Sequence, residues 1–264
     1  MARIGHDAAV VRLTRPIGNL ADMDRNDYLA ALEADGAQFA LACEAAGLAA
    51  VVPGCPEWTI ADLVWHLAEV HDFWRTVVAE QLTGWDSYVQ PPRPPDGDLV
   101  MFYRAGLAAT VEVLRATDPA TVVWTWSSDK TVAFVVRRMA HETMIHRWDA
   151  EMAAGLSSTL EPALASDGID EFLTHFIHDA AAEAAAVGGS VHIHCGDVRG
   201  EWTIREGADG ALDVTREHAK GDCAIRGAAG DILLALWRRT PLTSVDVIGD
   251  AEVSARFVAR PSLN

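Results

Sequence analysis

The hydrophobic pattern of the chain changes its period at Gly188-Gly189, and this change constrains the fold most strongly. Before it, apolar residues recur at the 3.6-residue spacing of amphipathic helices, whereas short strand-like segments separated by Gly and Asp turns follow it. Four helices are predicted first, and then a fifth helix or connector, at residues 24–46, 59–82, 98–116, 130–154 and 161–186. Strands are predicted at residues 190–195, 201–205, 211–216, 222–227 and 244–248, with helices at residues 229–239 and 250–258.

This order predicts an α+β protein, in which a four-helix bundle precedes a small α+β domain. A length of 264 residues suits two separate cores. We expect an N-terminal extension, the bundle, a connecting helix and the α+β domain at residues 1–23, 24–158, 159–187 and 188–264, respectively.

Composition narrows the possible partners and the compartment. A formal net charge of −17 argues against nucleic acid and an anionic membrane as partners. We find no apolar run long enough for a signal peptide or a membrane helix, so the cytoplasm is the expected location. The cysteines show no C-x-x-C spacing and are expected to be free thiols: Cys43, Cys55, Cys195 and Cys223.

The strongest functional signal is the pair Glu142 and His146, which lie four residues apart in the apolar stripe of a helix. The sequence His141-Glu142 begins the zincin pattern His-Glu-x-x-His, but His146 follows His141 by five residues, about 140° around the helix. His141 therefore cannot share a metal with His146. The opposite side of this helix is expected to face solvent and carries Arg137, Ala140, Met144, Arg147 and Glu151.

A second helix carries a histidine in the same kind of position. Thr59 is its expected N-cap, with Asp62 three residues on in a variant of the capping box. Counting about 100° per residue puts His66 at the centre of this helix's apolar face, near Leu63. His71 falls about 140° away and is expected to point toward solvent.

His66, Glu142 and His146 together would leave coordination positions open on a metal, which is the catalytic arrangement for zinc. Nickel, iron and manganese accept the same donors. Asp149 would accept the second ring N–H of His146, and Arg138 would neutralise Glu142. The alternative is a hydrogen-bonded core, with Arg138 and Glu142 as an i, i+4 ion pair.

Two segments resemble the signature helices of the mycothiol-dependent maleylpyruvate isomerase family. They are residues 52–67 (VPGCPEWTIADLVWHL) and residues 137–149 (RRMAHETMIHRWD). The bundle of that family belongs to the DinB-like superfamily. Residues 223–239, followed by Gly249-Asp250, resemble its C-terminal domain, which is similar to sterol carrier protein folds. The resemblance covers the chain from about residue 24 onward.

This resemblance implies that His66, Glu142 and His146 bind a divalent metal, usually zinc, with nickel as another candidate. The co-substrate would be mycothiol, an actinobacterial sugar thiol, which the metal converts to a thiolate that attacks an electrophilic small molecule. The implied activity is that of a cis-trans isomerase or a thiol transferase. The family's C-terminal helix often ends in Gly-Arg; its arginine matches Arg239, and Arg238 replaces the glycine, so both arginines are candidates for holding a substrate carboxylate.

Two other functions stay open at this point. The same metal would activate water in a hydrolase, for which Asp149 is the obvious candidate base, although its spacing from His146 suits an orienting role better. The chain would otherwise be a non-catalytic protein that binds a small molecule. We expect a monomer or a homodimer, and the sequence selects no particular substrate.

Overall fold

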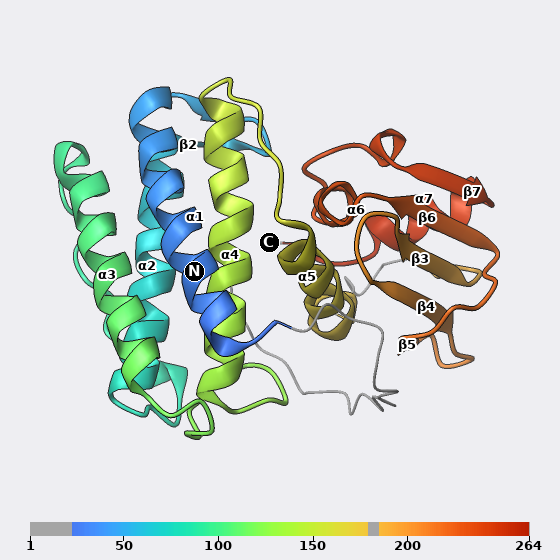
Figure 1. Cartoon of the computed structure of the whole chain (residues 1–264), viewed down its shortest axis with the longest axis horizontal. Helices are drawn as coiled ribbons and strands as arrows, with labels where there is room; N and C mark the ends of the chain where they lie inside the picture. The colour runs from blue at the N-terminus through green and yellow to red at the C-terminus, as the bar shows by residue number, and fades with distance from the viewer. Residues whose placement is uncertain (1–22, 179–184, 264) are drawn as a thin grey trace. The chain divides into compact units, whose positions relative to one another are not determined.

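The computed structural model describes residues 23–178 and 185–263 (Figure 1). The described residues form two compact units, Asp24–Thr159 and the segment from Leu160 onward. The first is mainly helical and the second contains a five-stranded sheet, so the predicted α+β fold class is confirmed. The expected extension at residues 1–23 lies outside the described residues, apart from Met23. None of the described helices is long and apolar enough to span a membrane.

Four helices make up the first unit: α1 (Arg25–Ala46), α2 (Ile60–Ala79), α3 (Leu99–Ala116) and α4 (Val132–Ala153). Helix α1 packs along α4 and α3, and α2 packs against α3 and α4 (Figure 1). Short 3-10 helices lie at Trp85–Ser87 and Asp96–Asp98. Each long helix begins and ends within three residues of the range that its apolar periodicity predicts.

The start of α2 is fixed by a capping box. The Thr59 hydroxyl accepts a hydrogen bond from the backbone N–H of Asp62, and the Asp62 carboxylate accepts one from the N–H of Thr59 at 3.0 Å. A short hairpin, β1 (Val51–Val52) and β2 (Cys55–Thr59), leads directly into this cap. The sequence analysis predicted no strand in that segment. The hairpin and the cap together hold the first turns of α2 in place.

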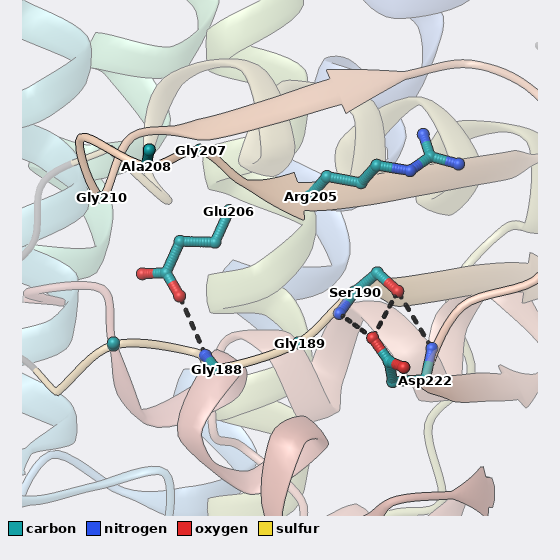
Figure 2. A pocket seen from close by; sticks show the side chains of 10 residues that line it. Gly188, Gly189, Ser190, Arg205, Glu206, Gly207, Ala208, Gly210 and Asp222 are labelled. Carbon is teal, nitrogen blue, oxygen red and sulfur yellow. Dashed lines mark hydrogen bonds between the residues drawn. The ribbon is translucent and has the colours of Figure 1, made fainter.

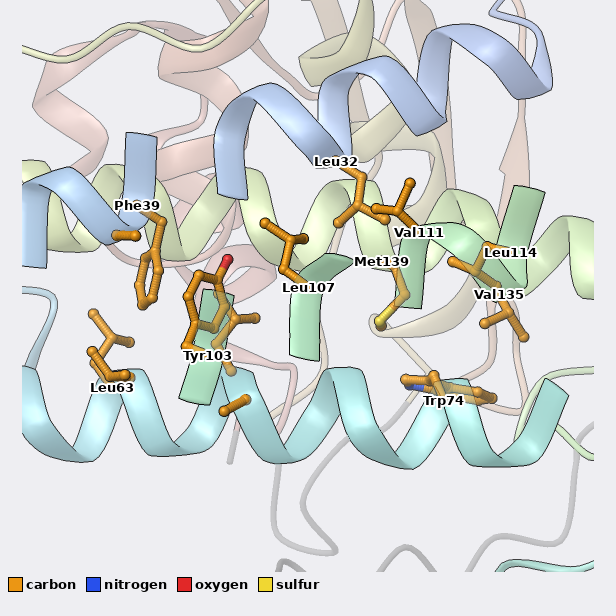
Figure 3. Packing of buried hydrophobic residues seen from close by; sticks show 14 of the residues in the cluster. Leu32, Phe39, Leu63, Trp74, Tyr103, Leu107, Val111, Leu114, Val135 and Met139 are labelled. Atoms are coloured by element: carbon orange, nitrogen blue, oxygen red, sulfur yellow. The ribbon is translucent and has the colours of Figure 1, made fainter. Parts of the chain in front are cut away.

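The core of the bundle draws fully buried side chains from all four helices (Figure 3). Burial of each large apolar side chain stabilises the fold by about 1.5–3 kcal/mol. The contributing residues include Leu32, Phe39, Leu63, Tyr103, Leu114, Val135 and Met139.

The prediction that one side of α4 faces solvent is wrong. Ala140 and Met144 are fully buried, and Arg147 is only 8% exposed. Because α1 packs along this side, Arg147 forms an ion pair with Asp35 of α1, at 2.9 Å. A second ion pair joins Arg147 to Glu151 at 2.6 Å. Charged residues here are paired inside the bundle and do not mark a hydrated surface.

The second unit begins with α5 (Pro162–His175) and contains a five-stranded sheet in the order β5-β4-β3-β6-β7. Only the pair β3 and β6 is parallel. Helices α6 (Ala229–Leu236) and α7 (Ala251–Ala259) pack against β6, and a 3-10 helix lies at Leu242–Ser244. The strands are β3 (Val191–Cys195), β4 (Glu201–Glu206), β5 (Leu212–Thr215), β6 (Cys223–Gly227) and β7 (Asp246–Gly249).

One face of this sheet is apolar and the other is polar. Ile193 and Trp202 lie opposite each other in the β3–β4 ladder and are fully buried. The Trp202 indole N–H donates to Asp170 of α5 at 3.0 Å, so this face packs toward α5. Side chains alternate along a strand, so His192 and His194 point to the other face. Part of the connector predicted after α5, residues 179–184, lies outside the described residues.

Candidate metal centre

Helices α2 and α4 bring His66, Glu142 and His146 together, although 76 residues separate His66 from Glu142. One carboxylate oxygen, Glu142 Oε1, lies 3.3 Å from Nε2 of His66 and 3.3 Å from Nε2 of His146. All three candidate ligand atoms lie within 4.8 Å of one another. Ligand atoms around a tetrahedral zinc lie about 3.3 Å apart, given zinc–nitrogen and zinc–oxygen bonds of about 2.0–2.1 Å. The donor set therefore fits a divalent cation.

Asp149 orients the imidazole of His146 from behind. Its Oδ2 lies 3.0 Å from Nδ1 of His146, and the carboxylate is fully buried. A carboxylate can only accept, so this contact places the ring proton on Nδ1 and turns the lone pair of Nε2 toward Glu142. Two lone pairs then face each other across 3.3 Å, which is favourable only when a proton or a cation lies between them.

The pKa values of the pair agree with this geometry. Burial alone would raise the pKa of Glu142, but the Arg138 guanidinium and the two imidazoles outweigh burial and hold that pKa well below its usual range. Burial likewise lowers the pKa of His146, yet hydrogen bonds to Asp149 and Glu142 outweigh it and raise the pKa. Glu142 is therefore ionised, and the cluster attracts positive charge.

Arg138 donates to the other oxygen of Glu142, Oε2, so the two oxygens have separate roles. Oε2 is bound by the guanidinium, while Oε1 faces the imidazoles. The i, i+4 ion pair considered in the sequence analysis is thus present together with the histidine cluster. It leaves one carboxylate oxygen for a metal.

The cluster opens to solvent on the side of His66, whose side chain is 33% exposed, compared with 9% for His146. The indole ring of Trp58 lies 4.9 Å from the His66 ring. Trp58 comes from β2, and the sequence analysis did not place it near His66 because no strand was predicted in that segment. A strand followed by an N-cap was the signal that could have placed Trp58 next to the first turns of α2.

The two histidines that helical geometry excluded lie outside the cluster. His141 packs edge-on against Tyr28 of α1, with ring centroids 6.1 Å apart. His71 does not face solvent as predicted. It is fully buried, its Nε2 lies 2.9 Å from the Thr143 hydroxyl, and burial lowers its pKa to about 3. The prediction failed because α2 packs against both α3 and α4. A side chain about 140° around the helix from His66 is therefore still inside the bundle.

The two candidate arginines differ in their surroundings. Arg238 has φ of 57°, the left-handed conformation in which glycine is favoured. Its guanidinium donates to the carbonyls of Val258, Ala259 and Pro261, at 2.7 to 3.0 Å, and so caps the end of α7. Arg239 donates to the Trp237 carbonyl at 3.2 Å. Arg238 therefore has a structural role in its own unit.

A pocket in the second unit is lined by two carboxylates and several glycines (Figure 2). Asp222 accepts hydrogen bonds from the backbone and hydroxyl of Ser190, both at 2.7 Å, and Glu206 accepts one from the N–H of Gly188 at 2.9 Å. These bonds from the backbone lower the pKa of both carboxyls. The carboxylates hold the chain segment before β3 in place, and glycines form much of the remaining wall.

Comparisons with known proteins agree with the fold. The family model described as the mycothiol maleylpyruvate isomerase N-terminal domain matches residues 29–151, and the C-terminal domain model of the same family matches residues 163–256. Crystal structures of the mycothiol-dependent maleylpyruvate isomerase and of a mutant of it are similar in fold, each with a TM-score of 0.57 and 11% identity. Each alignment covers 85% of this chain and 93% of the crystallised chain.

Two uncharacterized proteins of Mycobacterium tuberculosis, one from each of two strains, are 30% identical over 113 residues. The match covers 42% of this chain and 57% of each relative, so it spans little more than half of their length. Both family models together cover most of the sequence from α1 to α7. The chain belongs to the mycothiol maleylpyruvate isomerase family.

Proposed function

We propose that this protein is a metal-dependent enzyme that uses mycothiol as a thiol co-substrate and acts on an electrophilic small molecule as an isomerase or a thiol transferase. The observation that carries the proposal is the convergence of His66, Glu142 and His146 from two helices, with Asp149 behind His146. Family membership supports the choice of thiol, because the solved relative is named for mycothiol dependence.

The proposed metal ligands are Nε2 of His66, Oε1 of Glu142 and Nε2 of His146. Three ligands leave positions for a small molecule, and a divalent cation such as Zn²⁺ or Ni²⁺ would supply the charge that lowers a thiol's pKa to near neutrality. Asp149 keeps His146 in the required tautomer. Arg138 keeps Glu142 ionised and fixes the direction of its free oxygen.

The chain's own buried thiols are poor nucleophiles, which supports an external thiol. Burial raises the pKa of Cys195 to about 12 and that of Cys223 to about 11, and it also raises the pKa of Cys43. These three buried thiols are therefore poor sources of a thiolate at neutral pH, which favours a molecule whose sulfur reaches a more favourable environment.

We further propose Arg239 as the residue that holds a substrate carboxylate by bidentate hydrogen bonds. Arg238 is the weaker candidate, because its guanidinium already donates to three backbone carbonyls. The test is to compare Arg239→Gln with Arg238→Gln. We expect the Arg239 variant to raise KM for carboxylate substrates, and the Arg238 variant chiefly to lower thermal stability.

Metal content and thiol dependence test the main proposal. His146→Gln and His141→Gln are a matched pair, because both change a buried histidine of α4 but only His146 belongs to the cluster. We expect His146→Gln to lose bound metal and activity, and His141→Gln to keep both. Elemental analysis gives the metal content and circular dichroism checks the fold.

The metal-loaded protein is incubated with an unsaturated carboxylic acid, with and without mycothiol. Liquid chromatography separates the cis and trans isomers, which have equal mass, and mass spectrometry detects a thiol adduct by its added mass. We expect turnover only with the thiol. Equal turnover without it would favour the hydrolase, in which the same centre acts on water. If the unmodified protein binds no metal and the His66→Ala variant keeps the fold, the chain would be a non-catalytic binding protein.

A further inference from the structure

A second cluster of imidazoles lies on the polar face of the sheet in the C-terminal unit. His192 and His194 are two residues apart on β3, so their side chains share a face. Glu201 of β4 lies directly opposite His194 in the antiparallel register and therefore points to the same face. Three potential ligands are thus held by two paired strands.

The segment after β5 adds a fourth side chain, His218. Its Nδ1 lies 3.0 Å from Oε1 of Glu201. The same oxygen contacts Nδ1 of His194 and lies 3.9 Å from Nε2 of His192. All four candidate ligand atoms lie within 4.8 Å of one another. One carboxylate oxygen is surrounded by three imidazole nitrogens, as Glu142 Oε1 is by two in the first unit.

Hydrogen bonding among these residues leaves one buried atom unsatisfied. His192 is 8% exposed, and its Nε2 has no hydrogen-bond partner although it faces the cluster. An unsatisfied buried polar atom costs about 1–3 kcal/mol. A neutral imidazole has one nitrogen lone pair available to a metal ion. A cation at the centre would accept that lone pair.

We propose that His192, His194, Glu201 and His218 form a second metal site, which binds a divalent transition-metal cation of the Zn²⁺, Ni²⁺ or Cu²⁺ class. Three imidazoles select these ions over Mg²⁺ and Ca²⁺, which prefer oxygen ligands. Arg226 lies beside His194 in the parallel register, but its side chain is exposed and solvent screens its charge.

Four protein ligands are the closed arrangement that structural zinc sites have. Three of the ligands lie on strands, and the fourth lies on the segment between β5 and β6. That segment already contacts the sheet through the Glu217 carbonyl, which accepts a hydrogen bond from the Thr203 hydroxyl at 3.1 Å. The proposed ion would cross-link the segment to the sheet and stabilise the C-terminal unit.

The test is titration of the metal-stripped, untagged full-length chain with ZnCl₂ alone, by calorimetry, with MgCl₂ as the selectivity control. The unmodified chain is expected to bind two zinc ions. His146→Gln removes the centre in the bundle, and in that background one zinc ion is expected to remain. Failure of the proposed function would remove the first ion only, so the two hypotheses are separated.

Glu201→Gln and His218→Gln are then added to the His146→Gln background, separately and together. We expect each to weaken zinc binding by more than the roughly tenfold that loss of an outer-shell partner costs. Lys220→Gln is the matched control, because Lys220 is exposed and lies in the same segment. His218 is 73% exposed at the side chain, so its replacement is expected to leave the fold intact, as circular dichroism would show.

Equal zinc stoichiometry and affinity in Lys220→Gln and His218→Gln would overturn the proposal, as would one zinc ion in the unmodified chain that His146→Gln abolishes. Thermal melts provide a second measurement. In the His146→Gln background, zinc is expected to raise the melting temperature of the Lys220→Gln chain more than that of the Glu201→Gln chain. MgCl₂ producing the same rise would also contradict an imidazole-rich site.

Discussion

Replacement of Asp149 by asparagine is the sharpest test of the centre in the bundle. The Asp149 carboxylate is fully buried and accepts the Nδ1 proton of His146 at 3.0 Å. Asparagine has nearly the same shape but no charge, so the change removes the charge-assisted part of this hydrogen bond. A hydrogen bond to a charged group contributes about 1.5–3 kcal/mol and a neutral one about 1 kcal/mol.

The expected loss of metal-binding free energy is therefore about 0.5–2 kcal/mol, or roughly 2- to 30-fold in affinity. This range overlaps the roughly 10–100-fold that outer-shell substitutions cost in metal sites. Competition with a chromophoric zinc chelator at neutral pH measures the change. Asp35→Asn is the matched control, because Asp35 pairs with Arg147 of the same helix α4 and is not one of the cluster's three candidate ligands.

The pH dependence gives the same experiment a second readout. Burial lowers the pKa of His146, but Asp149 and Glu142 outweigh it and raise that pKa, so protons compete with zinc for His146 in the unmodified protein. Asp149→Asn removes part of this rise and weakens the competition. The affinity ratio between the two proteins is expected to be largest above the raised pKa and to narrow as the pH falls below it. If the zinc affinity of Asp149→Asn at high pH lies within about twofold of that of the unmodified protein, a difference of under about 0.5 kcal/mol, the orienting role of Asp149 is refuted.

Three further predictions concern stability. His71→Gln removes a buried imidazole whose pKa in the folded protein, about 3, lies below its value in the unfolded chain. As the pH falls below about 6.5, the unmodified protein is expected to lose about 1.4 kcal/mol of unfolding free energy per pH unit relative to the variant, as measured by urea unfolding. Arg138→Met leaves Glu142 buried without its guanidinium and is expected to destabilise the metal-free protein by about 3–5 kcal/mol, partly restored by zinc in thermal melts. Gly249→Ala puts a Cβ against the Asp222 carbonyl oxygen at φ of 90°, and should cost about 2 kcal/mol or more in chemical denaturation; an unchanged midpoint would contradict this packing.

Helical periodicity was sufficient to place the bundle and to bring His66, Glu142 and His146 toward one interior, because a period of 3.6 residues fixes which side chains share a face. It could not distinguish solvent from a neighbouring helix. His71 and Arg147 were both assigned to water, and both are buried against other helices. Polarity on one helix face identifies a surface only when nothing packs there, and α4 has α1 and α2 on different sides.

The cluster on the sheet was missed for a different reason. The alternation His192-Ile193-His194 is a strand signal in which both histidines share a face, and it was readable in the sequence. Glu201 and His218 join it only through the antiparallel register and the path of the chain after β5, which local patterns do not specify. Contacts across a sheet need the pairing itself to be known.

The two clusters differ in the feature that separates chemistry from structure in metal sites. In the bundle there are three candidate ligands, of which His146 is backed by Asp149, and the side chain of His66 is one-third exposed, so small molecules can approach. On the sheet, four candidate ligands close around one centre, and His192 is nearly inaccessible. A cation there would have its coordination completed by the chain and no position left for a thiol. Zinc binding at the sheet is therefore expected to change the melting temperature and leave turnover unchanged, whereas zinc binding at the bundle is expected to determine turnover.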